Sequence, residues 1–156
     1  MGKARRRWWI GEFSPSSTAV ELPPPGKEDF VDDAVTVGKK LVDYCRNGLN
    51  LDAISSLYSP EIVSVEPMGN PGMPAEQHGI DKVVAKNRWW VDAHEIHHSS
   101  AEGPFPHGDR FAVIFHYEIT PKEGPQKGKR NKFSEVALYT VSSGKIVREE
   151  FFYDVG

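Results

Sequence analysis

The last third of the chain, residues 110–153, constrains the fold most strongly. It contains three apolar runs with strand-like alternation, RFAVIFHYEIT, NKFSEVALYTV and KIVREEFFYD. The pairs Gly108-Asp109 and Ser143-Gly144 are typical of tight turns between such runs. Acidic and imidazole side chains recur between the large apolar residues of these strands. Where such strands pair, these groups can form a polar spot within an apolar pocket, which is a common design for a small-molecule site.

The segment before these strands is mainly helical. Phe30, Ala34, Val37, Leu41 and Cys45 recur at spacings of three or four and predict one amphipathic helix. A second short helix, LDAISSLY, is expected to be capped by Asn50 and to stop before Pro60. A third helix, IDKVVAKNRWWVDA, is expected to start near Gly79.

Strands are expected on both sides of the third helix. EIVSVEPM alternates as a strand, and GNPGMPAEQHG after it is too rich in Gly and Pro to be regular. EIHHSSAEGPFPHGD is expected to be a strand that breaks between Gly103 and Pro106. Helices followed by runs of strands predict an α+β fold with a curved antiparallel sheet and about three helices on its concave side. Such an arrangement leaves a cone with an open mouth.

Composition limits the class of protein. The chain has 156 residues and a formal net charge of −3, so we expect one domain and no general nucleic-acid partner. No apolar run approaches the ~20 residues of a membrane-spanning helix, so no membrane partner is expected. A single cysteine, Cys45, allows no internal disulfide, and a cytoplasmic location is the default expectation.

Residues 1–27 differ from the remainder, 28–156, which we assign to the folded domain. They contain a basic aromatic start, MGKARRRWWIGEF, and a Pro- and Ser-rich continuation. We expect a flexible tail. Two interpretations are open: the three arginines touch anionic lipid or nucleic acid, or the tail is unrelated to the activity of the domain.

Four segments of the domain resemble the SnoaL-like branch of the nuclear transport factor 2-like (NTF2-like) superfamily. They are DAISSLYSPEIVSVEP, HGIDKVVAKNRWW, PHGDRFAVIFHYEIT and SGKIVREEFFYD, and together they span roughly residues 30–153. The resemblance implies a cone-shaped α+β barrel, commonly a homodimer, with a pocket between the sheet and the helices. Relatives include polyketide cyclases, ketosteroid isomerase, epoxide hydrolases, dehydratases and proteins that only bind ligands, so the fold does not decide the function.

The resemblance carries over to few site residues. It implies that Glu135 and Glu150 occupy positions where epoxide-hydrolase-like relatives keep inward carboxylates. Those enzymes place an arginine two residues before the first carboxylate, and this chain has Phe133 there. What remains is a single glutamate general acid/base, as in the cyclases.

Strand parity leaves two interpretations of this pair. If Glu135 and Glu150 both face inward, they form a carboxylate pair whose proton affinity is raised by desolvation and like charge, which suits acid/base catalysis. Alternatively, Glu135 forms an exposed cross-strand ion pair with Arg148 or Lys132. His116 is the third candidate for a catalytic role, as a partner that holds one carboxylate ionised.

Further residues are predicted to contact a ligand: Glu66, Tyr58, Trp89, Trp90, His98, Phe133 and Phe152. His94, Glu95 and His98 have the spacing of the HExxH motif, but that motif binds zinc from a helix and this segment is expected to begin a strand, so no metal or other cofactor is expected. We expect a small hydrophobic organic molecule as the ligand. The chain is then either a cofactor-free isomerase, cyclase, dehydratase or hydrolase, or a ligand carrier or protein-interaction domain without catalysis. Apolar residues on both faces of the strands predict a homodimer formed sheet to sheet.

Overall fold

The computed structural model describes residues 31–156. The predicted tail, residues 1–27, and Phe30 lie outside these described residues. Within them the chain forms three helices, none long and apolar enough to cross a bilayer. The helices and strands are α1 (Ala34–Arg46), α2 (Asn50–Leu57), β1 (Tyr58–Val65), β2 (Glu76–His78), α3 (Ile80–Ala93), β3 (His94–His107), β4 (Arg110–Pro121), β5 (Asn131–Ser142) and β6 (Lys145–Phe152).

Local signals set the first helix. The side chain of Asp33 accepts a hydrogen bond from the backbone N–H of Thr36 at 2.8 Å and caps α1. The predicted apolar face is buried at Ala34, Val37 and Leu41. Gly48 follows the helix with a φ of 71°, a conformation that favours glycine and ends helices.

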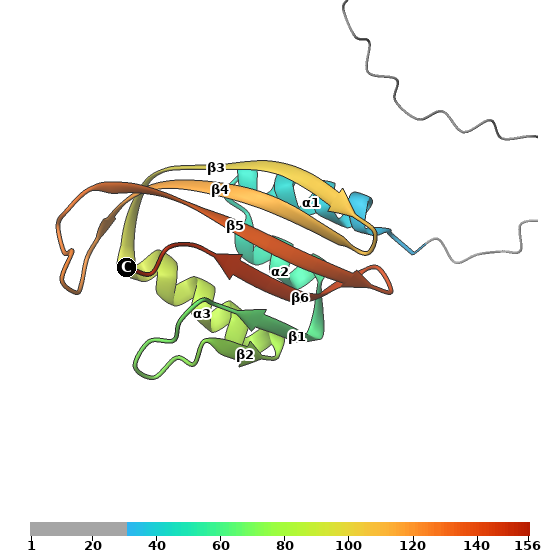
Figure 1. Cartoon of the computed structure of the whole chain (residues 1–156), viewed down its shortest axis with the longest axis horizontal. Coiled ribbons are helices and arrows are strands. Elements are labelled where there is room, and N and C mark those ends of the chain that lie inside the picture. The colour runs from blue at the N-terminus through green and yellow to red at the C-terminus, as the bar shows by residue number, and fades with distance from the viewer. Residues whose placement is uncertain (1–30) are drawn as a thin grey trace, which may run out of the picture.

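The six strands form one sheet in the order β2-β1-β6-β5-β4-β3 (Figure 1). Four of the five neighbouring pairs are antiparallel, and the predicted α+β fold with a helix-covered sheet is confirmed. The pair of β1 and β6 is parallel, so the sheet is mixed. Parallel neighbours need a long connection between the end of one strand and the start of the other. The segment between β1 and β6, which contains α3 and four strands, provides it.

Two expected boundaries were wrong. β1 begins at Tyr58 and runs through Pro60, and β2 lies inside the Gly- and Pro-rich segment that was expected to be irregular. The register between β1 and β6 shifts between Tyr58 and Val63, so Pro60 lies where the hydrogen-bonded ladder is interrupted and its missing N–H costs little. The predicted break near Gly103 is a register shift within a continuous β3.

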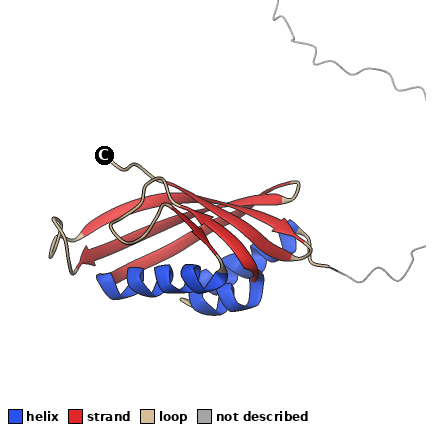
Figure 2. Cartoon of the chain, turned by 90° about the horizontal axis from the view of Figure 1, so that it is seen from below, coloured by secondary structure: helices blue, strands red, loops and turns tan. Residues whose placement is uncertain are grey.

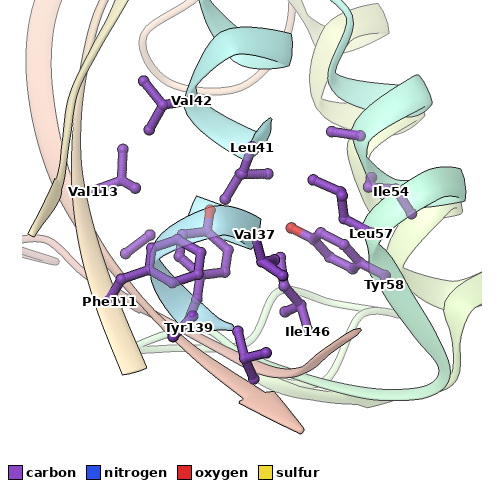
Figure 3. Packing of buried hydrophobic residues seen from close by; sticks show 14 of the residues in the cluster. Val37, Leu41, Val42, Ile54, Leu57, Tyr58, Phe111, Val113, Tyr139 and Ile146 are labelled. Atoms are coloured by element: carbon purple, nitrogen blue, oxygen red, sulfur yellow. The ribbon is translucent and has the colours of Figure 1, made fainter. Parts of the chain in front are cut away.

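All three helices lie against one face of the sheet, and the described part of the chain leaves the other face without a helix (Figure 2). The core fills the space between α1, α2 and the sheet. Its largest buried side chains include Leu41, Phe111 and Ile146, and Phe111 stacks on Tyr139 with ring centroids 5.0 Å apart (Figure 3). The core therefore joins the helices to the inner face of the sheet.

Candidate functional site

A cavity of about 690 Å³ lies between the helices and the inner face of the sheet. This volume suits a ligand of the size of a typical organic metabolite. Every helix and β3 to β6 contribute to its wall. Much of that wall is aromatic: Tyr58, Trp89, Trp90, Phe115, Tyr117, Phe133, Tyr139, Phe151 and Tyr153.

Glu135, on β5, places a carboxyl group in this apolar cavity. It shares the inner face with Phe133 and Tyr139, because side chains two residues apart on a strand point the same way. Burial raises the pKa of Glu135 to about 7; Glu66 and Glu149 add to this by repulsion, and Lys86 opposes it. No side chain or backbone group of residues 31–156 donates a hydrogen bond to this carboxyl. Glu135 therefore exchanges a proton near neutral pH and has its oxygens free for a ligand.

A second group of polar residues is held together by Lys86, which is 8% exposed on α3. Its Nζ donates to Oε1 of Glu66 at 2.6 Å and to Oγ of Ser64 at 2.7 Å. The same Nζ lies 3.6 Å from Oε1 of Glu149 and 4.4 Å from the ring centre of Phe151. The ammonium is thus surrounded by two carboxylates, a hydroxyl and an aromatic face.

Two tyrosines extend this group at both ends. The hydroxyl of Tyr58 donates to Oε2 of Glu149 at 2.5 Å, and Ser64 donates to the other oxygen at 2.7 Å. The hydroxyl of Tyr153 donates to Oε2 of Glu66 at 3.0 Å. Burial raises the pKa of Tyr58 well above its usual value, with the charge of Glu149 adding to the effect, so the phenol stays a donor. We call the six residues Tyr58, Ser64, Glu66, Lys86, Glu149 and Tyr153 the lysine network.

The structure brings six of the predicted site residues to the cavity wall: Tyr58, Glu66, Trp89, Trp90, Phe133 and Glu135. Glu66 follows the last residue of β1, and the two tryptophans lie on the last turns of α3. The alternative interpretation of Glu135 as an exposed partner of Arg148 or Lys132 was wrong. Arg148 pairs with Glu150, and Lys132 lies 3.9 Å from Glu118.

The expectation that Glu150 and Phe152 face the cavity was wrong. On the outer face, Nε of Arg148 donates a hydrogen bond to Oε1 of Glu150 at 2.6 Å. Phe152 lies on the same face and is 51% exposed. The register between β5 and β6 advances by one residue from Thr140 to Val141 and by two from Arg148 to Ile146. Val147 is therefore the extra residue of a β-bulge, which reverses the alternation. The inward residues of β6 after the bulge are Glu149 and Phe151.

A second bulge turns His98 outward, against expectation. Ile96 pairs with Ile119 and His98 with Glu118, so His97 is the extra residue of β3. Without the bulge, His98 would share the inner face with Ile96, which lines the cavity. With it, His98 shares the outer face with Glu118, and the histidine at the cavity is His94.

His116 also lies on the outer face, because the buried aromatic residues of β4 take the inner one. Its ring nitrogens contact Oγ of Ser134 at 2.6 Å and Oε1 of Glu102 at 2.7 Å. Ser134, His116 and Glu102 thus have the order of the nucleophile, base and acid of a catalytic triad. These contacts lie on the face of the sheet opposite the cavity, so none of the three side chains can act on a ligand bound there. The proposed pocket role of His116 was wrong.

The sequence reasoning missed Lys86 and Glu149. Lys86 follows Val83 by three residues and precedes Trp90 by four, so it occupies the apolar stripe of α3. A lysine at such a position is a signal for a buried ion pair. Glu149 carried no such signal, because only the bulge at Val147 brings it inward.

No metal-binding site is evident in the part of the chain that the structure describes. No three His, Cys, Asp or Glu side chains lie together in residues 31–156 as a metal ion would require. Cys45 lies at the cavity, where burial raises the pKa of its thiol to about 12. The groups that can act on a ligand here are thus the carboxyl of Glu135 and the lysine network.

Comparison with other proteins agrees with this fold. A candidate SnoaL-like polyketide cyclase from Mesorhizobium loti is 38% identical, covers 75% of this chain and 96% of its own, and has a TM-score of 0.69. An NTF2-like protein of unknown function from Burkholderia pseudomallei is 20% identical over 74% of this chain and 86% of its own, with a TM-score of 0.59.

A third solved structure contains a small molecule. It is a protein with a ketosteroid isomerase-like fold from Catenulispora acidiphila, in complex with trimethylamine. It is 14% identical over 75% of this chain and 84% of its own, with a TM-score of 0.56. No curated protein matches the chain. The family model for the SnoaL-like domain matches residues 36–153, and the chain belongs to this family of the NTF2-like superfamily.

Proposed function

We propose that the chain binds a small, mainly apolar organic molecule in its cavity and that Glu135 exchanges a proton with it. The observation that carries this proposal is a carboxyl group with a pKa of about 7 and no hydrogen-bond donor from residues 31–156, aimed into an aromatic cavity. A general acid/base works best when its pKa lies near the operating pH. Desolvation makes such a carboxylate a stronger base than it would be in water.

The reaction class that fits is proton transfer without a cofactor, as in isomerisation, aldol-type cyclisation, dehydration or hydration. The ionised form of Glu135 removes a proton from the substrate, and the protonated form returns it elsewhere. The likeness to a candidate polyketide cyclase, at 38% identity, supports this class. The second candidate is a carrier that binds the same kind of molecule and does no chemistry, for which the size and apolarity of the cavity suffice.

The lysine network has a positioning role in this proposal. The ammonium of Lys86 donates hydrogen bonds to Glu66 and Ser64. These bonds hold the part of the cavity wall next to Glu135 in place. The charge of Lys86 also lowers the pKa of Glu135, against the carboxylates that raise it. Burial and these opposing charges together place the pKa of Glu135 at about 7.

Direct titration of Glu135 tests the proposal without a substrate. Carbon-detected NMR of the side-chain carboxyl groups is expected to show one glutamate with a pKa near 7, absent in Glu135→Gln. Native mass spectrometry of the purified protein would identify a retained ligand. Once turnover of that ligand or its analogues is found, Glu135→Gln should abolish it and leave the fold intact. A Glu135 that titrates near the reference value of ~4.3 would favour the carrier.

We also propose that a second copy covers the outer face of the sheet. The outer face of the sheet has no helix of the described residues over it (Figure 2). Val136 pairs with Ile114 on one side and with Phe152 on the other, and Ala112 pairs with Leu138. Val136 is 38% and Phe152 51% exposed in the single chain. A contiguous exposed apolar patch of this kind is typical of a protein interface.

Light scattering at micromolar concentration is expected to give twice the mass of the chain. Val136→Arg, at the centre of the patch, should shift the protein to monomers because it buries an unpaired charge in the interface. Val155→Arg is the matched control, since Val155 is similarly exposed, at 49%, but lies beyond β6. A monomeric wild-type protein would contradict this prediction. The cytoplasmic location also stays a prediction.

A further inference from the structure

The carboxyl of Glu135 is surrounded by aromatic rings. The strand register places Phe115 directly opposite it, and Tyr117 opposite Phe133 in the next inward position. Phe151 pairs with Ala137, which follows Glu135 on the same face. The rings of Tyr117 and Phe133 lie 5.2 Å apart, and Tyr117 is also 4.9 Å from Trp90. A carboxylate and several ring faces thus border the same part of the cavity.

The charges at the cavity wall do not balance. The charges that act on Glu135 are the carboxylates of Glu66 and Glu149 and the buried ammonium of Lys86, and the cavity wall also includes Asp52 and His94. The ammonium of Lys86 is engaged with Glu66, Ser64 and Glu149. Glu135 receives no ion pair or hydrogen bond from residues 31–156. The empty space beside Glu135 therefore has an excess of negative charge when all four groups are ionised.

Three classes of ligand respond differently to this environment. An anionic group would meet repulsion from three carboxylates. If the ligand group is neutral, only a proton can neutralise the carboxylate of Glu135. A cation is attracted by the excess charge and by the negative faces of the aromatic rings, and an alkylammonium also buries apolar surface.

We propose that the ligand carries an alkylammonium group, tertiary or quaternary, that lies against Trp90, Tyr117 and Phe133 beside Glu135. The proposal deepens the proposed function, since it rests on the same cavity and names the chemical class of its ligand. The ammonium contacts the rings, the carboxylate neutralises it, and the remaining apolar part of the ligand fills the cavity toward Phe115 and Phe151. This ion pair lowers the proton affinity of Glu135 and keeps its carboxyl ionised while the ligand is bound.

Two probes of equal shape test the charge alone. They are 3-hydroxyphenyltrimethylammonium and 3-tert-butylphenol, which differ by one nitrogen for carbon exchange and one positive charge. We expect the ammonium probe to bind at least about tenfold more tightly at pH 7, where the hydroxyl groups of both probes are protonated, as measured by calorimetry or by NMR shifts of the cavity residues. Equal affinities, a tighter phenol, or no binding of either probe would overturn the proposal.

Two variants with matched controls show whether the preference for the ammonium probe arises from Glu135 and the aromatic rings beside it. Glu135→Gln should reduce the preference to below about twofold without changing the affinity for 3-tert-butylphenol, because only the charge is lost. Glu150→Gln should change neither affinity, since that carboxylate lies on the outer face. Phe133→Leu should weaken the ammonium probe by about fivefold and the phenol by less than about twofold. Phe152→Leu, on the outer face of the sheet, should leave both affinities unchanged.

The titration of ligand-free Glu135 separates this proposal from the proposed function. A pKa near 7 with no preference for the ammonium probe would overturn the ligand class and leave the acid/base function standing. An ordinary pKa with a clear preference would do the reverse. Loss of the preference in Glu150→Gln, but not in Glu135→Gln, would place the cation elsewhere and overturn the proposal.

Discussion

Replacement of Glu135 by glutamine is expected to stabilise the protein at pH 8.5 and to leave its stability unchanged at pH 4. In the folded chain the carboxyl holds its proton up to about pH 7, whereas an unfolded chain releases it near 4.5. Between these values the folded state binds more protons than the unfolded state, so stability falls as the pH rises. Above pH 7 the full cost is present, of the order of 3 kcal/mol for a carboxyl whose pKa rises from 4.5 to about 7 on folding.

Glutamine removes this cost because it stays neutral and Glu135 has no hydrogen bond from residues 31–156 to lose. Urea denaturation of both proteins at several values between pH 4 and pH 8.5 gives the difference directly. Groups that titrate alike in both proteins cancel from this difference. Glu61→Gln is the control, since Glu61 is an exposed glutamate on β1. A constant difference over the whole range would contradict the elevated pKa.

A gain in stability from the loss of Glu135 would also carry functional meaning. A residue that lowers stability at neutral pH, and whose removal damages no contact, is characteristic of a site kept for activity. If the chain is only a carrier, an ionisable group at this position is expected only when the ligand is charged. The ammonium probe and the pH series thus examine two separate roles of the same carboxyl.

Glu149 and Glu150 are adjacent, yet their replacement by glutamine is expected to have very different effects. Glu149→Gln should lower the free energy of unfolding by about 2–4 kcal/mol, because it leaves a buried ammonium and two hydroxyl donors with one acceptor fewer. The hydroxyls are those of Tyr58 and Ser64, and the ammonium is that of Lys86. Glu150→Gln removes an ion pair to Arg148, whose side chain is 40% exposed, and should cost less than about 1 kcal/mol.

Urea denaturation at pH 7 measures both changes, and each variant is the control for the other. Similar small losses would mean that Glu149 is not held by the lysine network. A larger loss for Glu150→Gln would mean that the strand faces inward at Glu150, which would remove the bulge at Val147. The comparison therefore tests the register of β6 as well as the energy of the network.

The order of the elements could be predicted from the sequence because it depends on local patterns. The apolar spacing of Ala34, Val37 and Leu41 defines one helix face whatever the helix packs against. Ser143 and Gly144 both adopt positive φ, 50° and 74°, as a two-residue turn between twisted strands requires. Strand alternation likewise assigns Phe133, Glu135 and Tyr139 to one face of β5.

The parity of β6 and β3 could not be predicted, because each strand contains a bulge. An extra residue at Val147 exchanges the faces of Glu149 and Glu150, and an extra residue at His97 turns His98 outward. A bulge depends on how two strands pair, and the partner strands lie 20 or so residues away in the case of β3 and β4. Nothing in the run KIVREEFFYD marks which residue is unpaired.

By itself, the sequence determined the fold class, the strand that carries Glu135 and the aromatic character of the wall, since these follow from residue types at short spacings. The tertiary structure alone decided that Lys86 of α3 meets Ser64 and Glu66 from the β1 segment and Glu149 of β6. Those residues are brought together by the parallel pairing of β1 with β6 and by the packing of α3 against β1. The raised pKa of Glu135 has the same origin, because desolvation and repulsion depend on distances between elements that are far apart in the chain.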